Sequence, residues 1–198
     1  MKIVSIVEGY GDVQAVPILL RRIAAEIPDT PYVDVPPPIR VRRQKILKEG
    51  EFERAVDLAA RQTTRDDGIL VLLDAESDCP YELSRKLLAR AATARADRRV
   101  RVVFPKRMYE AWFLAAAASI AGQRDLRPGL LAPPDPESNP NPKVWLTQQM
   151  PPERSYRETL DQPAFTSLLD LRAACAAPSF RKLCRDVASL FETPQPKL

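Results

Sequence analysis

A short apolar run that ends abruptly in acids constrains the fold of this chain more than any other feature. Ile69–Leu73 is continuously hydrophobic and follows Gly68. An apolar run of this length, bounded by a turn residue, is typical of a strand that is buried on both faces of a parallel sheet. Asp74, Glu76 and Asp78 then follow at alternate positions. The sequence therefore predicts a parallel sheet with acidic side chains at the end of one of its strands.

These three acids allow two interpretations. If the backbone stays extended beyond Leu73, the alternate side chains point to the same side and form a cup for a hard divalent cation. Such a cup would lie at the carboxyl end of a strand, where ligands bind in open α/β sheets. Alternatively, the acids belong to a polar loop in which Asp78 caps a helix that starts near Pro80.

Strand-like and helix-like segments alternate through the first 121 residues. Strands are expected at 2–7, 68–74 and 100–104, with a weaker, proline-interrupted strand at 32–41 that suits a sheet edge. Helices are expected at 13–27, 51–63, 81–96 and from about 106 to 121. This alternation predicts a Rossmann-like α/β domain over residues 1–121, with a mostly parallel sheet and helices on both of its faces.

The remainder of the chain has a different character. Residues 122–154 are rich in proline and are expected to form a long loop, within which Asn141–Leu146 resembles a short helix or docking segment. Residues 155–198 are expected to be a helical extension packed on the same domain, with helices at 156–160, 164–176 and 180–191. The last residues, from Thr193, are expected to be frayed.

The composition limits the available chemistry. The 198 residues include no histidine, and the three cysteines form no CxxC pair, so the usual zinc sites and histidine general bases are excluded. No apolar stretch reaches the ~18 residues that a membrane helix needs, and the N-terminus does not resemble a signal peptide. We therefore expect a cytoplasmic protein, without membrane contact, whose chemistry relies on carboxylates, Lys, Arg, hydroxyls and a bound ion.

A second acid follows the first strand. Glu8 ends that strand and precedes Gly9, and Asp12 is placed to cap the helix that follows. Because the carboxyl ends of parallel strands meet at one edge of a sheet, Glu8 and Asp74 are expected to lie within roughly 10 Å of each other, a span that one or two hydrated ions would bridge. The alternative is a structural Glu8 that accepts backbone N–H bonds at the start of the helix.

Taken together, these strand-end acids resemble the Toprim domain, which is shared by type IA and II topoisomerases, DnaG-type primases, small ribonuclease-maturation enzymes and OLD-family nucleases. The family's Glu-Gly motif matches Glu8-Gly9, and its Asp-x-Asp motif matches Asp74-Ala-Glu76-Ser-Asp78, with Glu in place of the middle Asp. Among Toprim-like proteins, the chain is most similar to a bacterial family known as a domain of unknown function. The segments that carry this likeness are Ile6–Gly9, Leu73–Pro80, Tyr109–Leu114 and Asn141–Lys143.

The resemblance implies Mg²⁺ (or Mn²⁺) at Asp74, Glu76 and Asp78, with Glu8 as an acid/base or as a ligand to a second ion. Such ions neutralise the charge that develops during phosphoryl transfer. Glu110 is expected either to complete the site or to stabilise the dipole of the helix that follows it. Lys106, together with Arg107, is expected to stabilise charge on the reacting phosphate. Trp112 and Phe113 are expected in the hydrophobic core.

Basic residues gather in two stretches of the sequence, at 40–48 and 95–107. Such clusters suit a polyphosphate backbone, although charge runs often lie on a solvated surface. The residues expected to contact nucleic acid are Arg40, Arg42, Arg43, Lys45, Arg101 and Arg107.

The leading functional prediction is a metal-dependent nuclease that acts on DNA or RNA, in a bacterial defence or mobile-element system. The alternative is a catalytically silent Toprim-fold subunit that binds nucleic acid or regulates a partner. A phosphatase of the haloacid-dehalogenase type would need a nucleophilic Asp after its first strand, where this chain has Glu8-Gly9. Topoisomerases and primases would need further domains. Whether a partner ATPase controls the activity is left open by the sequence.

Overall fold

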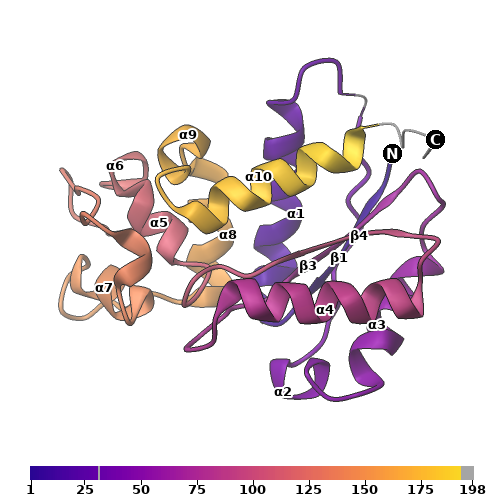
Figure 1. The fold of residues 1–198 in the computed structure, drawn as a ribbon. Coiled ribbons are helices and arrows are strands. Elements are labelled where there is room, and N and C mark those ends of the chain that lie inside the picture. Colours follow the sequence, from indigo (N-terminus) through magenta and orange to yellow (C-terminus); the bar gives the residue numbers. More distant parts are fainter. Residues whose placement is uncertain (31, 193–198) are drawn as a thin grey trace.

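The computed structural model describes residues 1–30 and 32–192 and contains a four-stranded, all-parallel sheet (Figure 1). The strands are β1 (Ile3–Val7), β2 (Ile39–Arg40), β3 (Gly68–Leu72) and β4 (Arg99–Val103), in the order β2-β1-β3-β4. Val7 at the end of β1 pairs with Leu72 at the end of β3. The expected α/β fold is confirmed, and so is the edge position of the strand from the 32–41 segment, although β2 has only two residues.

Helices cover both faces of the sheet. Within the Rossmann-like part they are α1 (Tyr10–Ala25), α2 (Arg43–Ile46), α3 (Glu51–Ala60), α4 (Pro80–Ala94), α5 (Ala111–Ala115) and α6 (Ala117–Ile120). They are followed by the 3₁₀ helix η1 (Pro136–Ser138), α7 (Pro142–Gln148), α8 (Glu158–Leu168), α9 (Leu171–Ala174) and α10 (Pro178–Phe191). The helix expected near Asn141 is therefore present as α7.

Side chains alternate between two hydrophobic cores, one on each face of the sheet. Ile3 and Val7 point into a core shared with α1, α5, α8 and α10, whereas Val4 and Ile6 point into a core shared with α3 and α4. All five residues of β1 are buried, as they are in β3, which explains why both strands carry apolar residues on both faces, with the buried Ser5 as the polar residue of β1.

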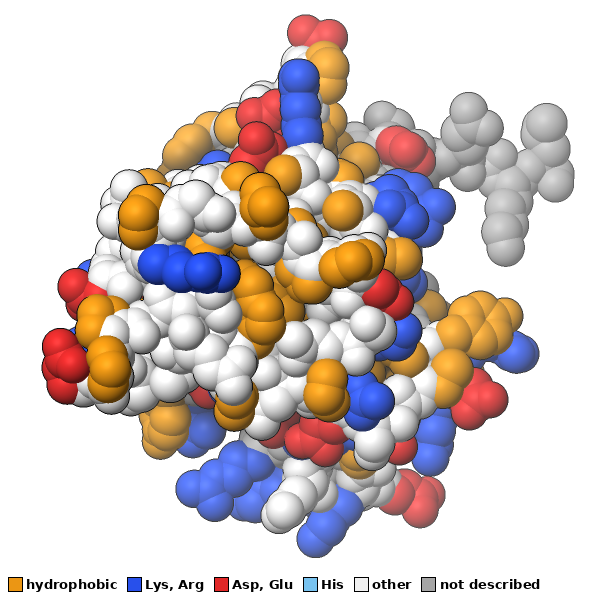
Figure 2. Space-filling model, turned by 90° about the vertical axis from the view of Figure 1, so that its left-hand side faces the viewer, with side chains coloured by type: hydrophobic (Ala, Val, Ile, Leu, Met, Phe, Trp, Pro, Cys, Tyr) orange, Lys and Arg blue, Asp and Glu red, His pale blue; other side chains and the backbone are white. Residues whose placement is uncertain are grey.

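The C-terminal helices extend the first of these cores. In Figure 1, α8 lies beside α1 and α10 crosses above the sheet, and both helices contact α1. Trp112 and Phe113 of α5 are fully buried in this core, as expected. The side of the molecule on which α6, α7 and α9 lie carries mostly uncharged and hydrophobic side chains, with basic and acidic groups scattered among them and along its lower margin (Figure 2). The predicted frayed tail, from Thr193, lies outside the described residues.

Three local expectations were wrong. The first helix begins at Tyr10 with Gly9 as its N-cap residue, so Asp12 lies in its first turn, where its carboxylate accepts the Gly9 backbone N–H. Asp78 does not cap α4, whose N-cap is Cys79 and has no side-chain capping bond. The alanine-rich helix is two short helices because the backbone turns away from helical geometry at Ala116. Across residues 1–30 and 32–192, no helix has the length and apolarity to cross a membrane.

Candidate functional site: an acidic pocket

A small pocket of about 90 Å³ lies at the carboxyl edge of the sheet, and we call it the acidic pocket. Glu8, directly after β1, and Asp74, shortly after β3, both line it, as the sequence predicted for two neighbouring strand ends. The full lining is Glu8, Gly9, Asp12, Asp74, Tyr109, Glu110, Lys143, Glu158 and Gln162. Five carboxylates thus face one cavity with a single basic side chain.

Asp74 is held by the backbone that follows β4. Its Oδ1 accepts a hydrogen bond from the backbone N–H of Tyr109 at 2.9 Å. Burial raises the pKa of Asp74 well above its usual range, and the negative charges of Glu110 and Asp12 raise it further. Perturbation by burial together with neighbouring charges, inside a cavity, is characteristic of functional carboxylates.

Glu110 is the most enclosed acid of the acidic pocket, with 1% of its side chain exposed. Its Oε1 accepts a hydrogen bond from the Tyr156 hydroxyl at 2.9 Å. Burial raises the pKa of Glu110 to about 7, although the positive charge of Lys143 opposes that rise. Glu110 is the N-cap residue of α5, but its side chain makes no capping bond, so its contacts lie with the acidic pocket and not with the helix terminus.

Burial also raises the pKa of two further acids. For Glu8, the charge of Glu76 adds to the effect of burial. For Asp12, burial is opposed by the hydrogen bonds that its carboxylate accepts from the Gly9 backbone, at 2.9 Å, and from the Gln162 amide, at 2.7 Å. The acidic pocket is therefore a site where negative charge is costly unless a cation compensates for it.

Lys143 supplies the one positive charge. Its Nζ donates to Glu158 Oε2 at 2.6 Å and lies 3.7 Å from Glu110 Oε1. The charges of Glu110 and Glu158 raise the pKa of Lys143 against the opposing effect of its own burial. Asn141 caps α7 by accepting the backbone N–H of Val144, and this cap fixes the first turn that carries Lys143.

Two glycines allow α8 to approach the start of α1. A Cβ atom on Gly9 would lie 2.5 Å from Glu158 Oε1, and one on Gly11 would lie 2.0 Å from Gln162 Oε1 and 2.9 Å from the Glu158 carbonyl oxygen. Side chains at these positions would push α8 away. The glycines after Glu8 therefore permit the approach that brings Glu158 and Gln162 into the acidic pocket.

The other two acids of the expected triplet lie outside the acidic pocket, so the expectation that the three carboxylates share one side was wrong. The backbone does not stay extended: β3 ends at Leu72, and Glu76 takes a left-handed conformation with φ of 53°. The Arg43 guanidinium pairs with both Glu76, at 3.4 Å, and Asp78. The role of Glu76 and Asp78 as metal ligands remains a prediction. Their ion pairs with Arg43 weigh against it, because the arginine already supplies a positive charge to both carboxylates.

Several oxygen atoms in the acidic pocket have no hydrogen-bond partner. Glu8 Oε2, Glu110 Oε2 and Gln162 Oε1 are all buried, and none has a partner among the residues that the structure describes. All three are acceptor atoms, and carboxylate and amide oxygens are the ligands that Mg²⁺ and Ca²⁺ prefer. The donor chemistry thus fits a hard cation. In the part of the chain that the structure describes, however, no three Asp, Glu, Cys or His side chains are already grouped around a single metal position.

The predicted basic residues separate into different environments. Arg40 stacks over the Tyr10 ring, and it lines a surface hollow together with Arg42 and Lys45. Arg43 is buried and paired with acids, as described above. Arg101 points to α10, where it donates to the Ser189 hydroxyl at 2.9 Å.

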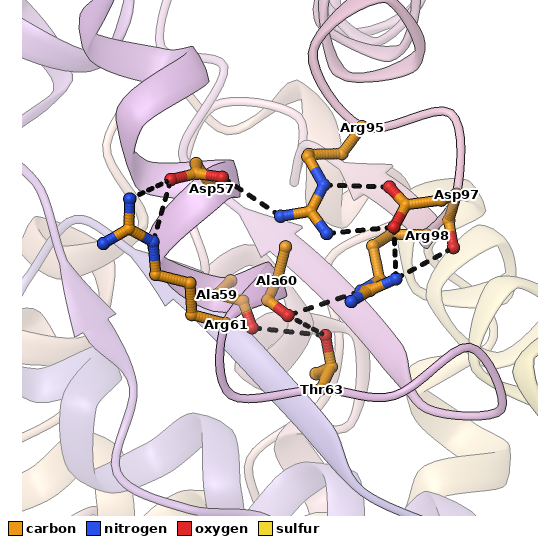
Figure 3. Close-up of polar contacts among 8 residues, drawn as sticks. All are labelled: Asp57, Ala59, Ala60, Arg61, Thr63, Arg95, Asp97 and Arg98. Carbon is orange, nitrogen blue, oxygen red and sulfur yellow. Dashed lines mark hydrogen bonds and ion pairs between the residues drawn. The ribbon is translucent and has the colours of Figure 1, made fainter.

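The second basic stretch is divided between the two ends of β4. Arg95 and Arg98 are held by Asp57, Asp97 and the Ala60 carbonyl, near the start of β4 (Figure 3). Lys106 and Arg107 follow the other end of β4, and neither lines the acidic pocket. The catalytic role expected for Lys106 is therefore not supported by proximity to Asp74.

Sequence reasoning missed four residues of the acidic pocket. Asp12 was interpreted as a helix cap, and Lys143 was noticed only within the Asn-Pro-Lys segment. Glu158 and Gln162 lie four residues apart on α8, so they share one helix face, but nothing in the sequence indicated that this face meets α1.

Comparison with known proteins identifies one relationship. A family model described as "Domain of unknown function (DUF4276)" matches residues 7–188, which include every residue that lines the acidic pocket. No curated protein and no solved structure matched the chain.

Proposed function

The chain belongs to the DUF4276 family, and we propose that its acidic pocket is the site of a divalent-metal-dependent nuclease of Toprim-like type. The observation that carries this proposal is the convergence of five carboxylates and three unpartnered buried acceptors on one cavity at the carboxyl edge of the sheet. Ligands of open α/β sheets bind at this edge.

Asp74 and Glu8 are proposed as the principal ligands, with Glu110 or Asp12 completing the set after adjustment of their side chains. A bound Mg²⁺ or Mn²⁺ would supply charge stabilisation for an attacking and a leaving phosphate oxygen. The Tyr109 N–H orients Asp74, and the Tyr156 hydroxyl orients Glu110. Because Glu110 has a pKa of about 7, its carboxyl group is suited to accept or donate a proton near neutral pH.

The test is to incubate the purified protein with supercoiled plasmid, single-stranded DNA and RNA, in Mg²⁺, Mn²⁺ or EDTA. We expect cleavage that depends on the metal and is lost in Asp74→Asn. The same variant is expected to unfold at a higher temperature than wild type in EDTA, because it removes a buried negative charge, and to lose the stabilisation by millimolar metal.

Asp66→Asn is the matched control, since Asp66 is exposed and precedes β3, at the end of the strand opposite to Asp74. It should retain both cleavage and the metal-dependent rise in melting temperature. Absence of cleavage on every substrate, together with absence of a metal-dependent rise in wild type, would refute the nuclease proposal.

The alternative is a catalytically silent subunit, and one observation favours it. Lys143 already places a positive charge between Glu110 and Glu158, so the protein's own ammonium group partly neutralises the acidic pocket. In a silent subunit this ion pair would be structural, and metal would leave the melting temperature of both wild type and Asp74→Asn unchanged.

A further inference from the structure

A second cavity lies on the other side of the segment that follows β4. It has a volume of about 470 Å³ and is bounded by the start of α4, the end of β4 and the start of α10. Its charged lining consists of four cations, Arg85, Lys106, Lys182 and Arg185, and one acid, Glu137. We call this cavity the basic groove.

Three of these cations are available to a ligand. Within residues 1–30 and 32–192, Arg85, Lys106 and Arg185 form no ion pair, and all three are exposed. Lys182, in contrast, pairs with Asp186. The single acid, Glu137, is buried and accepts both the backbone N–H and the hydroxyl of Ser179.

An exposed aromatic ring lies beside these cations. Tyr81 is 68% exposed although it is a large aromatic residue, and it lines the basic groove. The Arg85 guanidinium lies 5.7 Å from the centre of its ring. A positively charged groove with an exposed aromatic ring is the combination that binds single-stranded nucleic acid, because cations contact the phosphates and an unpaired base stacks on the ring.

We propose that the basic groove binds single-stranded nucleic acid, with phosphates at Arg85, Lys106 and Arg185 and a base stacked on Tyr81. This inference rests on the proposed nuclease function and names its substrate class. A duplex fits the arrangement less well, since its bases are stacked on one another and do not offer a free face to Tyr81.

The basic groove adjoins the acidic pocket through one short segment. Lys106 lines the basic groove, whereas Tyr109 and Glu110, a few residues later, line the acidic pocket. The Pro105 carbonyl accepts the backbone N–H of Ala75 at 3.1 Å, which fixes this segment beside the residue that follows Asp74. A strand bound in the basic groove would therefore be separated from the proposed catalytic carboxylates by this segment alone.

The experiment measures binding without metal, so that it does not depend on cleavage. Fluorescence anisotropy in EDTA would follow a labelled single-stranded DNA, the matching RNA and the DNA duplex over a range of salt concentrations. In Arg85→Gln/Lys106→Gln/Arg185→Gln, the slope of log K against log [salt] should flatten by about 2, from roughly 0.7 for each lost phosphate contact. Tyr81→Leu should weaken single-strand binding on the order of tenfold and leave the slope unchanged.

Matched controls are available among exposed residues that do not line the basic groove. Lys86 is exposed and follows Arg85 in α4 but does not line the basic groove, and Tyr32 is 84% exposed away from it. Lys86→Gln and Tyr32→Leu should bind as wild type does. All the substituted side chains are exposed, so each variant should unfold at nearly the wild-type temperature.

The outcomes separate this inference from the proposed function. Binding of either single strand that depends on Tyr81 and the three cations supports the basic groove, and the stronger of the DNA and RNA arms identifies the substrate. Such binding, without cleavage and without a metal-dependent rise in melting temperature, would overturn the nuclease proposal alone. Absence of single-strand binding, unchanged single-strand binding in the variants, or duplex binding by wild type as tight as its single-strand binding would overturn the basic groove, whatever the cleavage result.

Discussion

The ammonium group of Lys143 lies 3.7 Å from the carboxylate of Glu110, which is almost completely buried. This pair joins α7, from the proline-rich segment, to the residue that precedes α5. Within residues 1–30 and 32–192, Lys143 is the only basic side chain that lines the acidic pocket. It therefore balances part of a charge that would otherwise be carried by acids alone.

We expect Lys143→Gln to lower the free energy of unfolding in EDTA. Removing one partner of a fully buried ion pair typically costs 3–5 kcal/mol, and the partial exposure of Lys143 reduces the expected loss to about 1–2 kcal/mol. Added Mg²⁺ or Mn²⁺ should stabilise the variant more than wild type, because the metal is no longer repelled by the Lys143 ammonium group. Urea unfolding with and without metal measures both effects.

Lys86→Gln is the control for this substitution, since Lys86 is exposed on α4 and does not line the acidic pocket. Its unfolding free energy should change by less than about 0.5 kcal/mol in either condition. If Lys143→Gln proved equally neutral and gained nothing from metal, the Lys143–Glu110 pair would have no role in balancing the acidic pocket.

The raised pKa of Glu110 predicts a pH dependence of stability. Between the ordinary value of 4.5 and the folded value of about 7, the folded state holds a proton that the unfolded state has released. Stability in EDTA should therefore fall as the pH rises through this window, and the raised pKa values of Glu8, Asp12 and Asp74 act in the same direction.

Urea unfolding of wild type and Glu110→Gln at pH 5 and pH 8 checks this expectation. Glutamine carries no charge, so the variant should lose less stability between the two pH values than wild type does. Glu53 and Asp97 do not interfere, because arginines lower their pKa values to about 2, well below the window. An identical loss in both proteins would contradict the assignment of the effect to Glu110.

The sheet and its acidic edge could be predicted from the sequence because each rests on local information. The buried runs that end at Glu8 and Asp74 identify two neighbouring parallel strands, and parallel strands bring their carboxyl ends to one edge. The part of the site that α8 contributes could not be predicted. Glu158 and Gln162 enter the acidic pocket only because α8 packs on α1, a contact between segments about 150 residues apart, as the Gln162–Asp12 hydrogen bond shows.

The interpretation of the acidic triplet failed for a comparable reason. Alternation implies a shared side only while the backbone is extended, and the left-handed conformation of Glu76 ends that regularity. The counter-charge is Arg43, which belongs to a short helix that the sequence pattern did not indicate. Arg43 had been grouped with its exposed neighbours because a run of basic residues does not distinguish a buried arginine from solvated ones.

Arg43 provides a further prediction. Its side chain is only 9% exposed, and its guanidinium donates to the Asp74 and Ala75 carbonyl oxygens in addition to pairing with Glu76 and Asp78. Arg43→Met should lower the free energy of unfolding by about 3 kcal/mol, since it leaves several acceptors without a donor. Thermal or urea unfolding measures the loss.

The neighbouring Arg42 is exposed and lies at a surface hollow, so Arg42→Met should change stability by less than about 0.5 kcal/mol. Comparing Arg42→Met with Arg43→Met also separates an arginine that stabilises the fold from one that is expected to bind nucleic acid. Of these two variants, only Arg42→Met is expected to weaken nucleic-acid binding without loss of stability. A stable Arg43→Met variant would show that Arg43 does not hold the turn after β3.

Gly11 offers the most direct test of how the acidic pocket is assembled. In an ordinary helix, replacing glycine by alanine stabilises the protein by up to about 1 kcal/mol. At Gly11 the new Cβ would meet Gln162 Oε1 at 2.0 Å and the Glu158 carbonyl oxygen at 2.9 Å, and a backbone atom cannot move without displacing α8. Overpacking of this kind costs about 1–3 kcal/mol, so Gly11→Ala should be destabilising overall.

Gln14→Ala is the control within the same helix, because Gln14 is exposed and the change affects helix propensity alone. We expect Gly11→Ala to lower the urea midpoint and to reduce the metal-dependent rise in melting temperature, as Glu158 and Gln162 move away from Asp12. Gly9→Ala should be milder, because its closest contact, Glu158 Oε1 at 2.5 Å, is the end of a flexible side chain. A Gly11→Ala variant more stable than wild type would mean that α8 does not approach α1 this closely in solution, and the acidic pocket would then lack its α8 wall.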